Sequence, residues 1–162
     1  MEELKDNNDW GNNFQTPENV CRYMASFLPQ NAGDILEPTP GKGNLVSALK
    51  DKGNVMIVDD FWILQHKRFD WIVMNPPFSP MKDGYKILYK CMEMSDHIIA
   101  LLPYLAIING EKRTADIMNF GLKSITHLPR STFKGSRVQT CILELNKGFT
   151  GETIFKIFNK ND

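Results

Sequence analysis

The sequence predicts one α/β domain, with a mostly parallel β-sheet, helices on both faces and a C-terminal antiparallel hairpin. Two observations lead to this fold class. Early strand patterns that are apolar throughout alternate with helical patterns, as is typical of parallel strands buried on both faces. Three β-rich runs then follow one another closely near the C-terminus, which favours antiparallel pairing at that end of the sheet.

The expected strands are short apolar or β-branched runs between turn residues. They lie at residues 34–37, 55–58, 71–74, 97–102, 123–128, 140–145 and 153–158. The first expected helix starts with Thr16 as its N-cap and Pro17 as its first helical residue, followed by an apolar stripe at helical spacing. Further helices are expected at residues 44–52, 84–94 and 113–120.

Length and composition indicate one compact domain over residues 14–162, preceded by a polar, flexible N-terminal segment over residues 1–13. The 19 basic and 19 acidic side chains give zero net charge, so any nucleic-acid affinity must come from local charge or from a partner. The three cysteines fit no metal or redox spacing, which predicts reduced thiols, a cytoplasmic protein and no metal. The longest apolar run, residues 98–108, is interrupted by Pro103, and we expect no membrane segment.

The first candidate site is the loop between the strand at 34–37 and the helix at 44–52. It reads Glu37-Pro38-Thr39-Pro40-Gly41-Lys42-Gly43-Asn44. Ligands of open α/β sheets bind at the carboxyl ends of the strands, and two glycines let the backbone approach a ligand closely. The third glycine of a dinucleotide site is missing, and so is the Ser or Thr of a phosphate-binding loop. The acidic Glu37 favours a cationic ligand, although a turn without a ligand has the same composition.

The second candidate site is the tetrad Asn75-Pro76-Pro77-Phe78, which directly follows the strand at 71–74. Two prolines remove two N–H donors and restrain the backbone, so the Asn75 side-chain oxygen and the Pro76 carbonyl remain as acceptors. Two acceptors suit an amino group with two hydrogens to donate, and Phe78 suits stacking on a base. Catalysis by positioning and electrostatics needs no general base before attack. A rigid turn is the alternative.

Together these motifs resemble the Rossmann-like amino-methyltransferases, in particular the branch that methylates adenine-N6 in DNA. Phe14-Gln15-Thr16-Pro17 resembles the Phe-x-Thr-Pro motif of that family, residues 35–44 its cofactor loop, and residues 75–78 its catalytic tetrad. A weaker similarity covers residues 128–133, where the family carries an aromatic residue that packs against the flipped base. The resemblance spans residues 14–145.

The resemblance implies S-adenosylmethionine as cofactor and Asn75, Pro76, Pro77 and Phe78 as catalytic residues. Cofactor contacts are implied for Asn75 and for Phe14, Thr16, Pro17, Glu37, Pro38, Thr39, Gly41, Gly43 and Asn44. Residues 44–74 leave room for one clear strand where the family has two, so we expect one βα unit to be shortened. Either Asp59 or Asp60 is then the acidic residue expected on the cofactor ribose.

Residues 117–143 contain no acidic side chain but include several basic ones around Phe133. Such a pattern suits phosphate contacts beside a stacked base, although an ordinary solvated loop is also compatible with it. The substrate-binding residues expected here and in the tetrad are Phe78, Arg130, Phe133, Lys134 and Arg137.

The expected activity is methyl transfer to adenine-N6 in DNA, with the target base flipped out. Cytosine-N4, an RNA guanine, a protein glutamine and a catalytically inactive cofactor-binding subunit are the alternatives. The target-recognition domain of the family has no counterpart in this sequence. Recognition is therefore expected from a homodimer or a separate specificity subunit, in a bacterial or phage restriction-modification setting.

Overall fold

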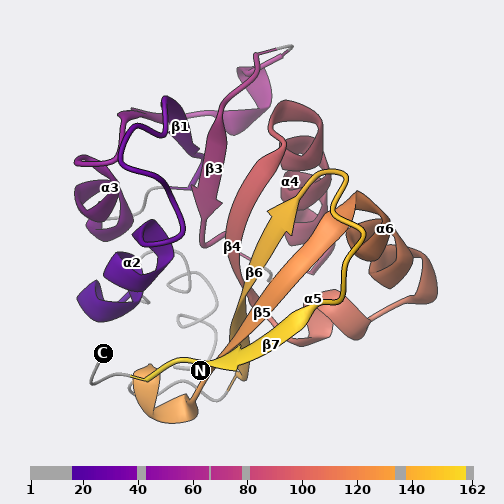
Figure 1. Cartoon of the computed structure of the whole chain (residues 1–162). Coiled ribbons are helices and arrows are strands. Elements are labelled where there is room, and N and C mark those ends of the chain that lie inside the picture. Colours follow the sequence, from indigo (N-terminus) through magenta and orange to yellow (C-terminus); the bar gives the residue numbers. More distant parts are fainter. Residues whose placement is uncertain (1–15, 40–42, 66, 78–80, 134–137, 160–162) are drawn as a thin grey trace, which may run out of the picture.

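The computed structural model describes residues 16–39, 43–65, 67–77, 81–133 and 138–159. Within these ranges the strands form one sheet of seven, in the order β2-β1-β3-β4-β6-β5-β7 (Figure 1). The strands are β1 (Asp34–Glu37), β2 (Asn54–Ile57), β3 (Trp71–Met74), β4 (His97–Pro103), β5 (Leu122–Leu128), β6 (Thr140–Asn146) and β7 (Ile154–Ile157).

Strand direction determines where a site can form. β1 is parallel to β2 and β3, and β3 is parallel to β4. β6 is antiparallel to both β4 and β5, while β7 is parallel to β5. The carboxyl ends of every strand except β6 therefore meet at one edge, the lower edge in Figure 1. The predicted mostly parallel sheet with an antiparallel hairpin is confirmed.

Helices cover both faces of the sheet, as expected (Figure 1). One face carries α2 (Glu18–Ala25) and α3 (Asn44–Leu49), whose apolar residues share a core cluster with Ile35, Val73 and Ile99. The other face carries α4 (Met81–Met94), α5 (Leu105–Ile108) and α6 (Glu111–Gly121), which pack on Ile72, Ile98 and the alternate residues of the same strands. Side chains of a strand alternate between faces, so each strand contributes to both clusters.

The βα unit between β2 and β3 is shortened, as the sequence predicts. The described residues of this connection form only the 3₁₀ turn η1 (Phe61–Ile63). β2 is consequently an edge strand of the described sheet, and Ile57 is 54% exposed there. Among the described helices, none combines the length and the apolar character that crossing a membrane requires.

Some expected boundaries are wrong. Thr16 is not the N-cap of α2, because Pro17, with ψ of 148°, takes that place and no side chain caps the helix. α3 ends at Leu49, three residues before the expected end, and α4 begins at Met81 rather than at residue 84. α5 was not expected, since four residues are too few to show a periodic pattern.

Candidate active site

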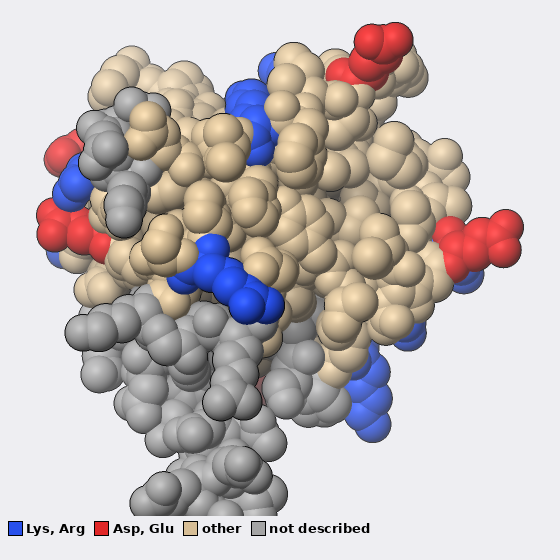
Figure 2. All heavy atoms as spheres, turned by 90° about the horizontal axis from the view of Figure 1, so that it is seen from below, with Lys and Arg blue, Asp and Glu red and all other residues tan. Residues whose placement is uncertain are grey.

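The two predicted sites meet at the carboxyl edge of neighbouring strands. β1 ends at Glu37 and β3 ends at Met74, directly before Asn75, and β1 and β3 pair in parallel. Figure 2 shows the molecule from below, the side to which these carboxyl ends point in Figure 1. The visible acidic side chains stand at the margin of this face, and a basic side chain lies nearer to its centre.

Glu37 is a buried carboxylate at this edge. It is 1% exposed, and its Oε1 accepts hydrogen bonds from the Thr39 backbone N–H at 2.8 Å and the Thr39 hydroxyl at 3.3 Å. Burial raises the pKa of Glu37 from its ordinary value of 4.5 to about 7, against the opposing effect of these bonds. No ion pair to Glu37 is found within the described residues, which leaves room for a cationic ligand to supply one.

Thr16 connects the two sites. Its hydroxyl oxygen accepts a hydrogen bond from Asn75 Nδ2 at 2.9 Å, and its backbone carbonyl accepts one from Asn44 Nδ2 at 3.2 Å. Thr16 is 6% exposed and Asn75 is half-buried. Three predicted site residues, from three separate parts of the sequence, are thus in contact, Asn75 through the Thr16 side chain and Asn44 through the Thr16 backbone.

The loop after β1 leaves space for a ligand at Gly43, the N-cap of α3. Gly43 has a φ of 90°, a left-handed conformation that favours glycine. A Cβ at this position would meet no atom of the described residues within 4 Å, which leaves open space beside the backbone in this part of the structure. Of the same loop, Pro38 is buried and Thr39 is half-buried, whereas Gly41 lies outside the described residues.

Asp59 and Asp60 follow β2 at the same edge, and both are exposed. Asp60 Oδ1 accepts a hydrogen bond from the Trp62 backbone N–H at 2.9 Å and so caps η1. Asp59 therefore has the stronger geometric case for a ligand role, because one oxygen of Asp60 already serves the turn.

The remaining predicted residues divide into described and undescribed ones. Pro76 is buried and Pro77 is half-buried, which fits a rigid backbone that presents hydrogen-bond acceptors. Arg130 begins the exposed turn η2 (Arg130–Thr132), which follows β5 at the carboxyl edge. Phe133 is half-buried and packs partly on the core cluster beneath α2. Besides Gly41, the predicted residues that lie outside the described ranges are Phe14, Phe78, Lys134 and Arg137.

One pair at this edge was not predicted from the sequence. Tyr104, just after β4, and His127 in β5 are joined by a hydrogen bond of 2.7 Å between Tyr104 Oη and His127 Nδ1. Burial raises the pKa of Tyr104 to about 12, so the phenol stays protonated at neutral pH. Neither residue lies in a recognisable motif. They meet because β6 lies between β4 and β5 and is antiparallel to both, so β4 and β5 end at the same edge of the sheet. The sequence alone does not reveal this strand order.

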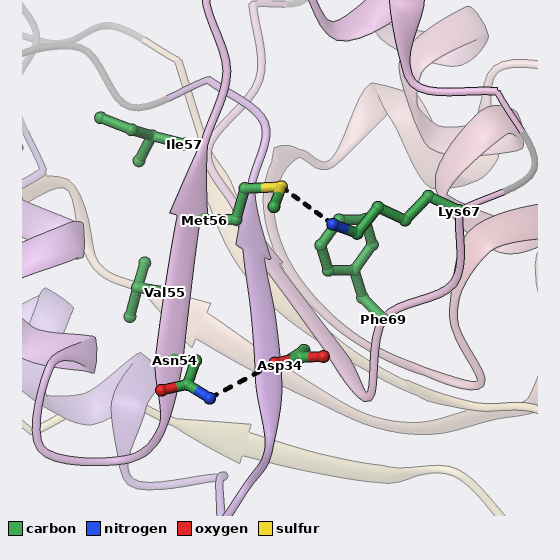
Figure 3. A pocket seen from close by; sticks show the side chains of 7 residues that line it. All are labelled: Asp34, Asn54, Val55, Met56, Ile57, Lys67 and Phe69. Carbon is green, nitrogen blue, oxygen red and sulfur yellow. Dashed lines mark hydrogen bonds between the residues drawn. The ribbon is translucent and has the colours of Figure 1, made fainter.

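A hollow of about 420 Å³ lies away from the predicted site (Figure 3). Residues of β1 and β2 line it together with Lys67 and Phe69, and Lys67 Nζ approaches Met56 Sδ at 3.7 Å. It adjoins the shortened connection from β2 to β3. None of the described site residues lines it, so the predicted chemistry does not use this hollow.

Comparison with known proteins bears on the fold. No family model and no curated protein matches the sequence. A solved structure from Listeria monocytogenes, assigned to the class I S-adenosylmethionine-dependent methyltransferases, matches with a TM-score of 0.68 and 18% identity, over 91% of this chain and 67% of that one. The chain has the class I methyltransferase fold.

Two further matches carry the same methyltransferase fold within longer chains. The type I restriction-modification methyltransferase subunit of Streptococcus thermophilus matches with a TM-score of 0.69 and 18% identity, over 89% of this chain and 47% of that one. The type I restriction enzyme EcoKI M protein matches with a TM-score of 0.67 and 14% identity, over 85% and 44%. The chain therefore spans about half the length of these two subunits.

Proposed function

We propose that the chain transfers a methyl group from S-adenosylmethionine to the exocyclic N6 amino group of adenine in DNA. The observation that carries the proposal is the contact of Thr16 with Asn75 and Asn44 at the carboxyl edge. It joins the Thr-Pro motif, the loop after β1 and the first residue of the tetrad into one site. This is the site at which the class I methyltransferase fold would hold its cofactor.

The residues present fit this cofactor. Its sulfonium and ammonium groups suit the buried Glu37, which has no cationic partner within the described residues. Gly43 leaves open space at the start of α3, and Asp59 is the exposed carboxylate that suits the ribose hydroxyls. No group of His, Cys, Asp or Glu in the described ranges is placed to hold a metal ion, and the proposed chemistry calls for none.

When bound, S-adenosylmethionine supplies an electrophilic methyl group. The N6 nitrogen of adenine is a poor nucleophile, because its lone pair is delocalised into the ring. Asn75 Oδ1 and the Pro76 carbonyl accept its two hydrogens and favour a pyramidal nitrogen whose lone pair points at the methyl carbon. The N–C bond would form as the S–C bond breaks, S-adenosylhomocysteine would be the leaving group, and the proton would pass from the nitrogen to solvent. Positioning and electrostatics supply the rate enhancement.

DNA is the proposed substrate because Arg130 is exposed at the same edge as Asn75, with Phe133 three residues further on. Type I restriction-modification subunits share the fold, which favours DNA and a partner that supplies recognition. A homodimer or a separate specificity subunit would provide that recognition. A bacterial or phage setting and a cytoplasmic location follow from the same proposal.

The test is methyl transfer from labelled S-adenosylmethionine to duplex DNA, RNA and protein, with the product identified by mass spectrometry. We expect N6-methyladenine in DNA. Asn75→Ala lowers turnover by at least about a hundredfold, because one acceptor of the amino group is lost, and leaves cofactor affinity within a few-fold. Asn109→Ala, an exposed asparagine at the end of α5, is the matched control and stays active.

Three results would contradict parts of the proposal. A fully active Asn75→Ala variant would remove Asn75 from catalysis. Label in RNA or protein, and not in DNA, would replace the substrate while keeping the methyltransferase. Failure of the wild-type chain to bind S-adenosylmethionine in calorimetry would favour an inactive subunit of a larger assembly.

A further inference from the structure

Thr16 lies between two segments that are distant in the sequence. Its hydroxyl accepts a hydrogen bond from Asn75, 59 residues away, and its carbonyl accepts one from Asn44, 28 residues away. The donor is the side-chain amide in both cases. Thr16 thus touches the tetrad with its side chain and the start of α3 with its backbone.

The position of Thr16 is set by the protein itself. The first backbone hydrogen bond of α2 runs from Cys21 N–H to the Pro17 carbonyl at 2.9 Å, and the Cys21 thiol lies 3.5 Å from the Thr16 carbonyl. Val20 and Cys21 are completely buried in the core cluster beneath α2. A hydroxyl held in this way is in place before any ligand arrives.

The Thr16 hydroxyl is not used for the local role that its sequence position suggests. A threonine before a helix commonly caps it, and a side-chain cap contributes about 1 kcal/mol to stability. In α2 the N-cap is Pro17, and no side chain of the described residues makes a capping bond. The hydroxyl is directed at Asn75 instead, which indicates a role in the site rather than in the helix.

The orientation of the Asn75 amide decides what Asn75 can bind. An asparagine side-chain amide presents an acceptor oxygen at one edge of its plane and a donor NH₂ at the other. The amino group of the proposed substrate donates hydrogens, so only the oxygen can bind it. If the Asn75 amide were rotated by half a turn, its NH₂ group would face the amino group of the substrate, and both groups are donors.

We propose that Thr16 is a positioning residue that holds Asn75 Nδ2 and thereby presents Asn75 Oδ1 to the amino group of the substrate. Because the amide is planar, fixing the nitrogen also fixes the direction of the oxygen. Asn44 extends the same contact to the loop that follows β1. This inference rests on the proposed function for the identity of the substrate, but the contact itself can be tested without it.

The test compares variants that keep or remove the hydroxyl. Thr16→Val removes it while leaving a branched side chain of similar shape, and Thr16→Ser keeps it. Thr126→Val is the matched control. Thr126 is a fully buried threonine in β5 whose hydroxyl bonds Tyr23 Oη at 2.8 Å, and it makes no contact with Asn75. If Thr16→Val does not fold, Thr16→Ala removes the same hydroxyl without filling its place.

At saturating cofactor we expect Thr16→Val to lower kcat by about 10- to 100-fold, because a misdirected acceptor loses its alignment with the reacting nitrogen. The cofactor dissociation constant stays within about three-fold. Thr16→Ser and Thr126→Val keep kcat within about three-fold of the wild type. Unchanged kcat in Thr16→Val, or a loss confined to cofactor affinity, overturns the positioning role.

A second readout needs no turnover. The side-chain NH₂ signals of Asn75 in a ¹⁵N-resolved NMR spectrum of the free chain are identified by their loss in Asn75→Ala. Thr16→Val shifts them toward the values of a solvated amide, whereas Thr16→Ser and Thr126→Val leave them in place. Signals that do not move in Thr16→Val overturn the contact. If Thr16→Val shows the shift but the wild-type chain methylates no substrate, the proposed function is refuted and the contact stands.

Discussion

Glu37 should make the folded chain less stable as the pH rises, which is the opposite of the effect of most carboxylates. Replacing Glu37 by glutamine should remove this loss. Burial raises the pKa of Glu37 from 4.5 to about 7 in the folded chain. Below pH 4.5 the carboxyl group is protonated in both folded and unfolded chains and costs the fold nothing. Above pH 7 it is ionised in both, and the folded chain bears the full cost of a buried charge.

The magnitude follows from the two pKa values. Each tenfold change in proton affinity corresponds to about 1.4 kcal/mol, so the full destabilisation by ionised Glu37 is about 3 kcal/mol at high pH. Between pH 5 and pH 8 the cost grows by about 2.5 kcal/mol, because part of it is already present at pH 5. The wild-type chain therefore loses this stability as the pH rises, and Glu37→Gln does not.

The assay is denaturant unfolding of the wild type and of Glu37→Gln at several pH values between 5 and 8. The difference in unfolding free energy between the two removes the contribution of all other titrating groups. Glu93→Gln, which replaces an exposed carboxylate on α4, is the matched control for the substitution itself. A Glu37→Gln difference that varies by less than about 0.5 kcal/mol over this range would refute the reasoning.

The same carboxylate predicts a pH dependence of cofactor binding. A cationic ligand beside Glu37 favours the ionised form, so binding releases a proton below pH 7. We expect the affinity of the wild type for S-adenosylmethionine to fall by up to about tenfold for each pH unit below pH 7, and to become independent of pH above pH 7. Glu37→Gln binds more weakly and without this dependence. Equal slopes for the two chains would separate Glu37 from the cofactor.

Two further predictions concern the rest of the fold. Gly33→Ala and Gly148→Ala both place a side chain at a φ near 85°, which costs about 1 kcal/mol. Only at Gly33 does the new Cβ meet a side chain, the Asp70 carboxylate, which accepts a hydrogen bond from the Asp34 backbone N–H at 2.8 Å. In denaturant unfolding, Gly33→Ala should therefore lower the free energy of unfolding by about 1 to 2 kcal/mol more than Gly148→Ala does. Equal losses in the two variants would contradict this contact. Burial raises the pKa of every thiol, so a thiol reagent should label none in the native chain and three after unfolding, at Cys21, Cys91 and Cys141.

Periodicity identified the elements that bury a continuous stripe, but it could not reveal their partners. The apolar runs at β1 and β3 are evident in the sequence, and so is the helical spacing of α4. The parallel pairing of β7 with β5 was not predicted, because a four-residue strand exposed along its whole length carries no burial pattern. The same lack of local information applies to the contact of Tyr104 with His127.

The error at Thr16 has a different cause. The sequence Thr-Pro before an apolar helical stripe fits an N-cap by every local rule, and those rules consider only the residues of the helix itself. The structure assigns the cap position to Pro17, and the Thr16 hydroxyl has a partner 59 residues away in Asn75. Local rules take no account of such a long-range hydrogen bond, and a conflict of this kind is itself a sign of a functional position.

The strand order explains why Glu37 and Asn75 lie at the same edge of the sheet. From β1 the chain moves outward to β2, and then returns to place β3 on the other side of β1. The connections after β1 and β3 therefore leave the sheet in opposite directions, which is the arrangement at which open α/β sheets bind ligands. Thr16 spans these connections, with its carbonyl bonded to Asn44 after β1 and its hydroxyl to Asn75 after β3. Shortening the unit between β2 and β3 leaves this crossing unchanged, since β2 lies on the far side of β1.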